Sequence, residues 1–310
     1  MSNRRSFLKQ AMLFSGGIAL ASLPKRLMAK EAGAKKLTIL HTNDIHCRID
    51  PFAEGTFEGR GGLARLSGMI NRIRTEEDNV MLLDSGDMFQ GTPYFNTYKG
   101  ELIFKVMSKM GYQAATMGNH ELDNGLESLA RAMQHMRFPF VCSNYDFSGT
   151  SFMGEFVPYH IFYQKGIKVG VYGLGVELEG MVDAKNFEGI IYNDPIEVAQ
   201  KMEYQLKEKN KCDLVICLSH LGFEYTNENV KGKISDKRLA PHTKHTDLIL
   251  GGHTHTYLAE PYIAKNAHGK PVLINQTGWG GLNLGRIDVY FDEAKGEISF
   301  VDSTIIENKA

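Results

Sequence analysis

The sequence contains little cysteine, a single tryptophan and almost no net charge. Only four of its 310 residues are cysteine, and none of them forms a CxxC pair of the kind that holds structural zinc. Cys142, Cys212 and Cys217 lie in or beside apolar stretches, which is typical of core residues. The sequence therefore argues against a cysteine-based metal site, and it leaves the disulfide state open.

No stretch after residue 29 reaches the roughly 20 apolar residues that a membrane span requires. The 35 basic and 36 acidic side chains nearly cancel. Removing residues 1–29 takes away five basic groups, and the remaining 30 basic against 36 acidic groups give a formal charge of about −6. Such a balance does not support a polyanion-binding surface. We therefore expect no nucleic-acid polymer as a partner and no membrane span.

Residues 1–34 have the pattern of an export signal. A basic start with Arg4, Arg5 and Lys9 precedes an apolar run from Ala11 to Leu23, which is too short to cross a bilayer. The arginine pair matches the twin-arginine (Tat) pattern, which is an address and not an anchor. An ordinary secretory signal peptide that happens to hold two arginines is the alternative. Cleavage near residue 29 or 34 would leave residues 35–310 as a periplasmic or otherwise exported chain.

Strand-like and helix-like segments alternate along residues 35–310. Helical spacing of apolar residues is present in Gly62–Arg74, Glu101–Tyr112 and Ile196–Asn210. Short apolar runs typical of buried strands occur in KLTILHTND, NVMLLDSGD, AATMGNHE, KVGVYGLG, DLVICLSHLG and TDLILGGHTHT. The tail is rich in β-forming residues, with a turn expected at Ala294–Gly296. This alternation predicts an α/β layered fold with ligands collecting at the strand ends.

Five of these apolar runs end in side chains that can bind metals. They are LHTNDIH with Asp44 and His46, LLDSGD with Asp84 and Asp87, MGNHELD with Asn119, His120, Glu121 and Asp123, CLSHLG with His220, and GGHTHT with His253 and His255. One histidine after a strand is usually a hydrogen-bonded loop residue, but five such clusters in a fold that converges strand ends indicate a shared site. The mixture of carboxylate, amide and imidazole suits borderline divalent metals such as Zn, Mn, Fe or Co.

The order D-x-H, GD, GNHE, H and GHTH resembles the calcineurin-like metallophosphoesterases. The stretches LTILHTNDIH, LLDSGDMFQGTP, MGNHELDNG and DLILGGHTHT are similar to the catalytic, N-terminal domain of the 5'-nucleotidase family in particular. The likeness extends from about Lys36 to the end of the chain. It implies a four-layer α/β/β/α metallophosphoesterase sandwich, in which helices flank two mixed β-sheets, and a metal-dependent phosphoric ester hydrolase.

The resemblance also implies roles for the strand-end residues. The implied metal ligands are Asp44, His46 and His255 at a first ion, Asn119, His220 and His253 at a second, and Asp87 bridging both. Some relatives have glutamine at the position of His255, which leaves the preference of the first metal open. His120 corresponds to the family's catalytic histidine and Asp123 to the residue that orients it. Asp84 matches no ligand role and is expected to accept hydrogen bonds at a strand end.

The chemistry implied by this likeness is hydrolysis of phosphate monoesters, with 5'-nucleotides as the expected substrates. In such sites two divalent ions about 3.5–4 Å apart activate a water for attack on phosphorus. His120, held by Asp123, would then stabilise the developing charge and protonate the leaving oxygen. Action on 2',3'-cyclic nucleotides as a phosphodiesterase, or a sulfate thiohydrolase-like activity, are alternatives because they share nearly the same motifs.

Two features depart from the family pattern or leave alternatives open. The nucleotidases carry a C-terminal nucleotide-binding domain, and this sequence ends at Ala310 without one. We therefore expect either a separate chain that carries this domain or looser substrate demands, and a catalytic subunit or binding module that is inactive without its partner is a third interpretation. Arg60 in GRGG and Trp279 in TGWGG are candidate substrate contacts. The alternatives are a helix-entry turn for Arg60 and plain packing for Trp279.

Overall fold

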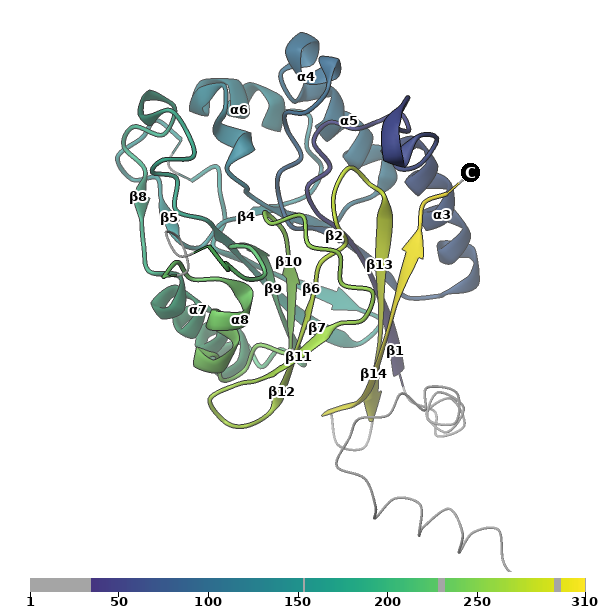
Figure 1. The fold of residues 1–310 in the computed structure, drawn as a ribbon. Coiled ribbons are helices and arrows are strands. Elements are labelled where there is room, and N and C mark those ends of the chain that lie inside the picture. Colours follow the sequence, from purple (N-terminus) through teal and green to yellow (C-terminus); the bar gives the residue numbers. More distant parts are fainter. Residues whose placement is uncertain (1–34, 153, 228–231, 293–296, 310) are drawn as a thin grey trace, which may run out of the picture.

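The computed structural model describes residues 35–309 apart from 153, 228–231 and 293–296. The predicted export signal in residues 1–34 and the turn expected at Ala294–Gly296 lie outside the described residues. Over the described ranges the chain forms two large β-sheets with helices on their outer faces (Figure 1).

The first large sheet has six strands in the order β14–β13–β1–β2–β3–β4 (Figure 1). Its strands are β1 (Lys35–Thr42), β2 (Val80–Asp84), β3 (Ala114–Thr116), β4 (Phe140–Val141), β13 (Asn283–Asp292) and β14 (Glu297–Glu307). Strands β1 to β4 run parallel, whereas β13 and β14 pair antiparallel. Parallel strands point the same way, so the carboxyl ends of β1, β2 and β3 lie at one edge of the sheet.

The second large sheet has the order β11–β12–β10–β9–β7–β6. Its strands are β6 (Tyr159–Gln164), β7 (Ile167–Gly175), β9 (Leu214–His220), β10 (Leu248–Gly251), β11 (Tyr262–Lys265) and β12 (Pro271–Asn275). Strands β7, β9, β10 and β12 are parallel, and β6 and β11 are antiparallel edges. A small separate ribbon pairs β5 (Tyr145–Asp146) with β8 (Ile191–Tyr192). Both large sheets are therefore mixed.

Helices cover the outer face of each sheet (Figure 1). Against the first sheet lie α3 (Leu63–Glu76), α4 (Pro93–Tyr98), α5 (Glu101–Met110) and α6 (Gly125–Met133). Against the second lie α7 (Pro195–Glu203), a π-helix η4 (Tyr204–Lys209) and α8 (Asp236–Leu239). The shorter 3-10 turns are η1 (Gly55–Phe57), η2 (His120–Leu122), η3 (Ala184–Asn186) and η5 (Ala240–His242). The helix predicted over Ile196–Asn210 is confirmed, but its second half widens into the π-helix.

Alternation of side chains along β1 shows how the layers form. Leu37 and Ile39 join the apolar cluster between the two sheets, while Leu40 joins the cluster under the helices. Because neighbouring residues of a strand face opposite sides, a strand buried on both faces reads as a continuous apolar run. Val169 and Val171 of β7 meet this inner cluster from the other sheet. The predicted four-layer α/β/β/α sandwich is confirmed.

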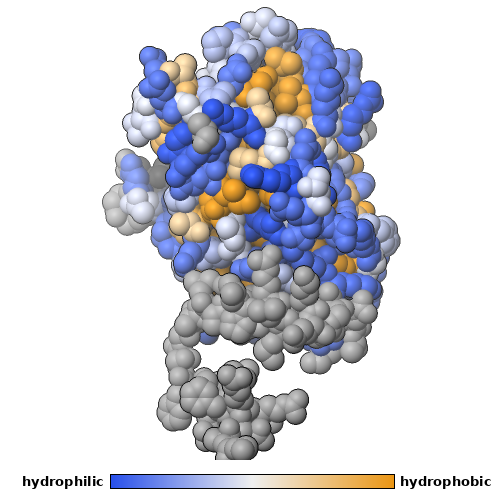
Figure 2. All heavy atoms as spheres, turned by 90° about the vertical axis from the view of Figure 1, so that its right-hand side faces the viewer, coloured by the Kyte–Doolittle hydropathy of each residue, from blue (hydrophilic) through white to orange (hydrophobic). Residues whose placement is uncertain are grey.

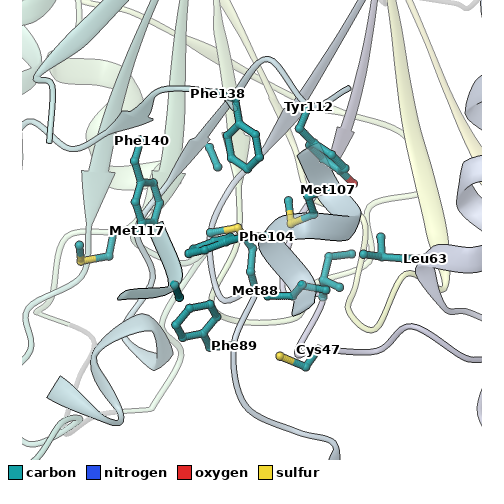
Figure 3. Close-up of a cluster of buried hydrophobic side chains, with 14 of the residues drawn as sticks. Cys47, Leu63, Met88, Phe89, Phe104, Met107, Tyr112, Met117, Phe138 and Phe140 are labelled. Atoms are coloured by element: carbon teal, nitrogen blue, oxygen red, sulfur yellow. The ribbon is translucent and has the colours of Figure 1, made fainter. Parts of the chain in front are cut away.

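Aromatic and sulfur-containing side chains fill the space between the first sheet and its helices (Figure 3). Phe104 of α5 lies within this cluster, with its ring centroid 5.0 Å from that of Phe89. Met88 and Phe89 belong to the loop that follows β2, and Met117 follows β3 directly. The loops at the strand ends are thus anchored by apolar side chains that pack into the core, and their buried polar side chains gather at the carboxyl ends of the strands.

The described residues contain no helix that is long and apolar enough to cross a membrane. On the side of the molecule that carries α3 and β14, apolar patches are interrupted by hydrophilic surface (Figure 2). A hollow on the β13–β14 hairpin is lined by Arg286, Asp288, Asp302, Thr304 and Ile306. Charged groups on an edge hairpin disfavour edge-to-edge pairing with another chain.

Phe104 gives a direct test of this core. Its side chain is 0% exposed, so Phe104→Ala should lower the free energy of unfolding by roughly 3–5 kcal/mol through lost burial and a cavity. Urea unfolding followed by circular dichroism measures the change. Tyr98→Ala, at a side chain that is 46% exposed, is the control and should stay within about 0.5 kcal/mol of wild type. A similar loss in both variants would contradict the described packing.

Candidate metal centre

The predicted ligands lie at one end of the sandwich, and both sheets contribute to them. Asp44 and His46 follow β1, Asp87 follows β2, Asn119 follows β3, His220 ends β9, and His253 and His255 follow β10. Strands β1, β2 and β3 are parallel, and so are β9 and β10, so their carboxyl ends can meet. The structure brings all seven side chains into two adjoining groups.

The first group consists of Asp44, His46 and His255, whose ligand atoms lie within 4.8 Å of one another. The Nε2 atoms of His46 and His255 are 3.0 Å apart. His255 Nε2 also lies 3.3 Å from Asp44 Oδ1. Two imidazole nitrogens and a carboxylate oxygen facing one another in this way form a donor set that suits a borderline divalent cation.

The second group consists of Asp87, His220 and His253, again within 4.8 Å of one another. His220 Nε2 lies 3.0 Å from Asp87 Oδ2, and His253 Nδ1 lies 3.0 Å from the side-chain oxygen of Asn119. His220 Nε2 is also 4.0 Å from Asp44 Oδ1, an atom of the first group. The two groups therefore adjoin.

Hydrogen bonds to backbone carbonyls fix the orientation of two of the imidazoles. Nδ1 of His46 lies 3.0 Å from the carbonyl oxygen of Phe89, and Nδ1 of His220 lies 2.7 Å from that of Ser85. A carbonyl only accepts, so Nδ1–H must donate and the lone pair of a neutral ring is on Nε2. This orientation directs Nε2 of His220 at Asp87 Oδ2, 3.0 Å away. Contacts of Nδ1 with surrounding carbonyl groups are typical of metal-binding histidines.

Burial and neighbouring charges shift the pKa values of the second group in different directions. Burial raises the pKa of Asp87, but the adjacent His220 outweighs this effect and holds that pKa below its usual range. Burial likewise lowers the pKa of His220, but Asp87 and Asp44 outweigh it and raise that pKa to about 10. Burial and the neighbouring His220 lower the pKa of His253 to about 4. A protonated imidazole thus supplies the positive charge that a bound cation would also supply.

Several predicted ligands have left-handed backbone conformations, which residues other than glycine rarely adopt. Their φ angles are 51° at Asp44, 51° at His46, 56° at Asp87, 73° at His253 and 51° at His255. Such conformations cost of order 1–3 kcal/mol each, persist only where the surrounding structure holds them and cluster at functional sites.

Two glycines let backbone and ligand side chains approach closely. A Cβ atom on Gly118 would lie 2.1 Å from Asp87 Oδ1, and one on Gly252 would lie 2.8 Å from the ring of His220. Neither distance is possible for a real side chain without movement of a predicted ligand. These positions therefore require glycine because of space.

His120 and Asp123 are in direct contact. His120 Nδ1 lies 2.7 Å from Asp123 Oδ2, and the backbone N–H of His120 donates to Asp87 Oδ1 at 2.9 Å. Burial lowers the pKa of His120, but the bond to Asp123 and the nearby Asp87 outweigh it and raise the pKa to about 9. His120 also belongs to a group with His46 and Asp87 whose ligand atoms lie within 4.8 Å of one another. A protonated imidazole is thus held beside both candidate metal groups.

Of the two candidate substrate contacts, Trp279 lies against the first group. Trp279 stacks on His255, with ring centroids 5.6 Å apart and planes 8° apart, and Phe52 meets the tryptophan edge-on at 5.1 Å. Arg60 lies over Phe57 at 5.6 Å and 3.8 Å from Glu307. Trp279 therefore packs against a predicted ligand, and a role of either residue in substrate binding stays a prediction.

The remaining polar residues of these motifs are tied into the loops. Asp84 accepts from Thr42 at 2.6 Å and from the N–H of Gly86 at 2.9 Å, which confirms its expected role as a strand-end acceptor. Sequence reasoning missed Asn43, whose amide donates to Asp44 Oδ2 at 2.6 Å and whose oxygen accepts from the N–H of Thr277. Its only signal was its place beside Asp44.

Glu121 of the GNHE stretch is among the strand-end side chains that could bind metal, but the family resemblance assigned it no role. Its buried carboxylate accepts hydrogen bonds from the backbone N–H groups of Asp87, Met88, Phe89 and Gly118. The four cysteines are free and buried, so the prediction that Cys142, Cys212 and Cys217 are core residues is confirmed.

Comparisons with known proteins point to one family. The profile of the calcineurin-like phosphoesterases matches residues 37–257. The 5'-nucleotidase of Homo sapiens is 32% identical over 302 residues, which cover 90% of this chain and 50% of that protein. A snake venom 5'-nucleotidase of Gloydius brevicauda is 32% identical over 300 residues, which cover 90% of this chain and 49% of that protein.

The fold is also similar to solved structures. A 5'-nucleotidase precursor from Thermus thermophilus superposes with a TM-score of 0.79 at 32% identity, over 88% of this chain and 55% of that chain. The chain spans about half the length of the curated relatives it matches.

Gly118 tests the close packing around Asp87. Gly118→Ala should weaken Mn²⁺ binding by about ten-fold or more, because the added methyl group displaces the Asp87 carboxylate. Isothermal titration of metal-stripped protein measures this affinity. Gly68→Ala is the matched control, because a Cβ there meets nothing within 4 Å and should slightly stabilise helix α3. Unchanged affinity in Gly118→Ala would show that Asp87 does not need its present position to bind metal.

Proposed function

The chain belongs to the calcineurin-like phosphoesterase family, whose members are metal-dependent phosphoester hydrolases, and we propose that it hydrolyses phosphate monoesters of 5'-nucleotides. One observation carries this proposal. Side chains from the ends of five strands in two sheets converge into two adjoining donor groups, with the His120–Asp123 pair beside them.

The donor set fits a pair of divalent ions. Asp44, His46 and His255 would hold one ion, and Asn119, His220 and His253 the other, with Asp87 shared between them. The mixture of imidazole, amide and carboxylate is typical of Mn, Zn, Fe or Co sites. The carboxylates of Asp44 and Asp87 are almost fully buried, and buried carboxylates are stable when they are paired with cations.

Bound metal ions supply Lewis-acid polarisation of a phosphate oxygen and acidify water, which is the chemistry that phosphate ester hydrolysis needs. The contribution of the chain's own residues centres on His120. Because its Nδ1–H donates to Asp123 and its pKa is raised to about 9, the ring is a cation near neutral pH. Its Nε2–H is then available to a phosphate or leaving oxygen, to which it would donate a proton.

Asp123 fixes the direction of this donor. Its Oδ2 accepts from His120 and also from the side-chain amide of Gln90 at 3.1 Å, and its backbone carbonyl accepts from Asn186. A carboxylate held on several sides keeps the imidazole in one orientation and one protonation state. Asp123 therefore acts through His120 and has no contact with substrate in this proposal.

The choice of nucleotides as substrates draws on the relatives that are named 5'-nucleotidases. Export through a twin-arginine signal in residues 1–34, and a separate chain that carries a nucleotide-binding domain, stay predictions from the sequence. The division into a signal peptide in residues 1–34 and a catalytic domain in residues 35–310 is likewise proposed.

Phosphate release by the purified chain tests the proposed function. With Mn²⁺ present, we expect hydrolysis of AMP and of p-nitrophenyl phosphate. Asp87→Ala should abolish both activities, because Asp87 is the carboxylate proposed to be shared by the two ions. Cyclic nucleotides and a sulfur-bonded sulfate ester belong in the same panel. Release of product from these compounds alone would replace the nucleotidase proposal, and release from none by a chain that binds Mn²⁺ would favour dependence on a partner.

His120 is expected to act in catalysis without holding the metals. His120→Ala should lower kcat on p-nitrophenyl phosphate by roughly 10²–10⁴-fold, the usual contribution of a positioned acid, while Mn²⁺ affinity stays within a few fold. Steady-state kinetics and titration calorimetry measure the two quantities. His135→Ala is the matched control. His135 also pairs with a carboxylate, that of Glu101 of α5 at 3.3 Å, but it belongs to neither donor group. Equal kcat in both variants would exclude His120 from the reaction.

A further inference from the structure

We propose that Glu121 is a positioning residue that holds the loop carrying Asp87 in the conformation in which Asp87 can bind metal. The inference rests on the proposed function, since Asp87 is the carboxylate proposed to be shared by two ions. It assigns to Glu121 no contact with substrate or metal.

The contacts of Glu121 are unusually complete for a side chain that is 1% exposed. Its Oε1 accepts from the N–H groups of Met88 at 2.7 Å and Phe89 at 3.1 Å. Its Oε2 accepts from the N–H groups of Asp87 at 3.0 Å and Gly118 at 2.7 Å. One carboxylate therefore joins the loop after β2 to the loop after β3.

Three of these donors are consecutive, so their N–H groups converge on one acceptor side chain. Consecutive backbone N–H groups that converge form a concave site for negative charge. Here the carboxyl group of Glu121 occupies that site. Without it the N–H groups of Asp87, Met88 and Phe89 would lose these hydrogen bonds in a buried place, at about 1–3 kcal/mol for each group left unsatisfied.

The same bonds act on a strained residue. Asp87 has a φ of 56°, a conformation that persists only when its surroundings determine it. The next two residues, Met88 and Phe89, are held in the apolar cluster under the helices (Figure 3). Glu121 accepts from the N–H of Asp87 itself and from that of Gly118, and the absence of a side chain on Gly118 leaves space for the Asp87 carboxylate.

A carboxylate fits this role and an amide does not. Each oxygen of Glu121 accepts two N–H donors, and a carboxylate has acceptors only. Glu121→Gln keeps the size of the side chain but, in either orientation of the amide, places an NH₂ group against two backbone N–H groups. The substitution therefore loosens the Asp87 loop and makes no cavity.

The chain offers a matched control in Glu203. This side chain is also 1% exposed and also accepts backbone N–H groups, from Lys244, His245 and Thr246 at 2.8 to 3.0 Å. Those N–H groups precede β10, whereas the predicted ligand His253 follows it. The contacts of Glu203 are therefore roughly 20 Å from His253 along the strand. Glu203→Gln should destabilise the fold in a similar way and leave the metal centre unchanged.

The experiment compares wild type, Glu121→Gln and Glu203→Gln as full chains. Metal-stripped proteins are titrated with Mn²⁺ by calorimetry, their Tm is measured without metal, and kcat and KM are measured with p-nitrophenyl phosphate at saturating Mn²⁺. We expect Glu121→Gln to weaken Mn²⁺ binding by about 10–100-fold, as loss of an outer contact does at other metal sites. Its kcat should fall by at least ten-fold with KM changed by less than three-fold. Glu203→Gln should lower Tm while Mn²⁺ affinity and kcat stay at wild-type values.

Three outcomes separate the ideas. Mn²⁺ affinity in Glu121→Gln equal to wild type would overturn the positioning role and leave the metal centre standing. Equal losses of affinity in both variants would also overturn it, because any destabilisation would then suffice. A wild-type chain that binds no Mn²⁺ would overturn the proposed function together with this inference.

If Glu121→Gln does not fold, Glu121→Asp replaces it in the experiment with the same expectations. This substitution keeps the carboxyl group but withdraws it by about 1.5 Å.

Discussion

Two carboxylates that have almost no contact with water govern the arrangement of this end of the molecule. Asp44 is 0% and Asp87 is 2% exposed, and an ionised carboxylate in such a place must be paired and hydrogen-bonded. The backbone N–H of His253 donates to both oxygens of Asp44, and that of His120 donates to Asp87. The side-chain amide of Asn43 also donates to Asp44, and imidazoles lie against both carboxylates. The left-handed turns and the close-packed glycines are what these contacts require of the backbone.

The two sheets divide the work of building the centre. The first sheet provides both carboxylates, and its loops are fastened by apolar side chains below and by Glu121 at the side. The second sheet provides His220, His253 and His255, from strands that contain little but apolar residues. The apolar residues of each strand therefore determine its place in the sandwich, and the polar residues at its carboxyl end supply the predicted metal ligands. Rigid strands hold the ligand positions, and short loops only turn the side chains toward one another.

Much of this could be predicted from the sequence, because its signals are local. Apolar runs that end in Asp, Asn or His mark the strands of a parallel sheet, and the spacing of apolar residues marks α3, α5 and α7. The arrangement in two mixed sheets followed only from the family resemblance, and the order of the strands within each sheet was not predicted. Short elements such as α4 and the β5–β8 ribbon were missed, because so few residues show no period. Glu121 and Asn43 were missed for another reason: their partners are largely backbone groups, which leave no mark in the sequence.

The distance in sequence between the two halves of the centre has a consequence for how the molecule comes into being. Asp44 and His253 are in contact although 209 residues separate them, and contacts of such high order form slowly because a long loop must first be closed. A nascent chain lacks this centre until β10 has been made and docked. Competence to capture an ion therefore requires the end of β10 to have docked against the end of β1, so that the two sheets have come together.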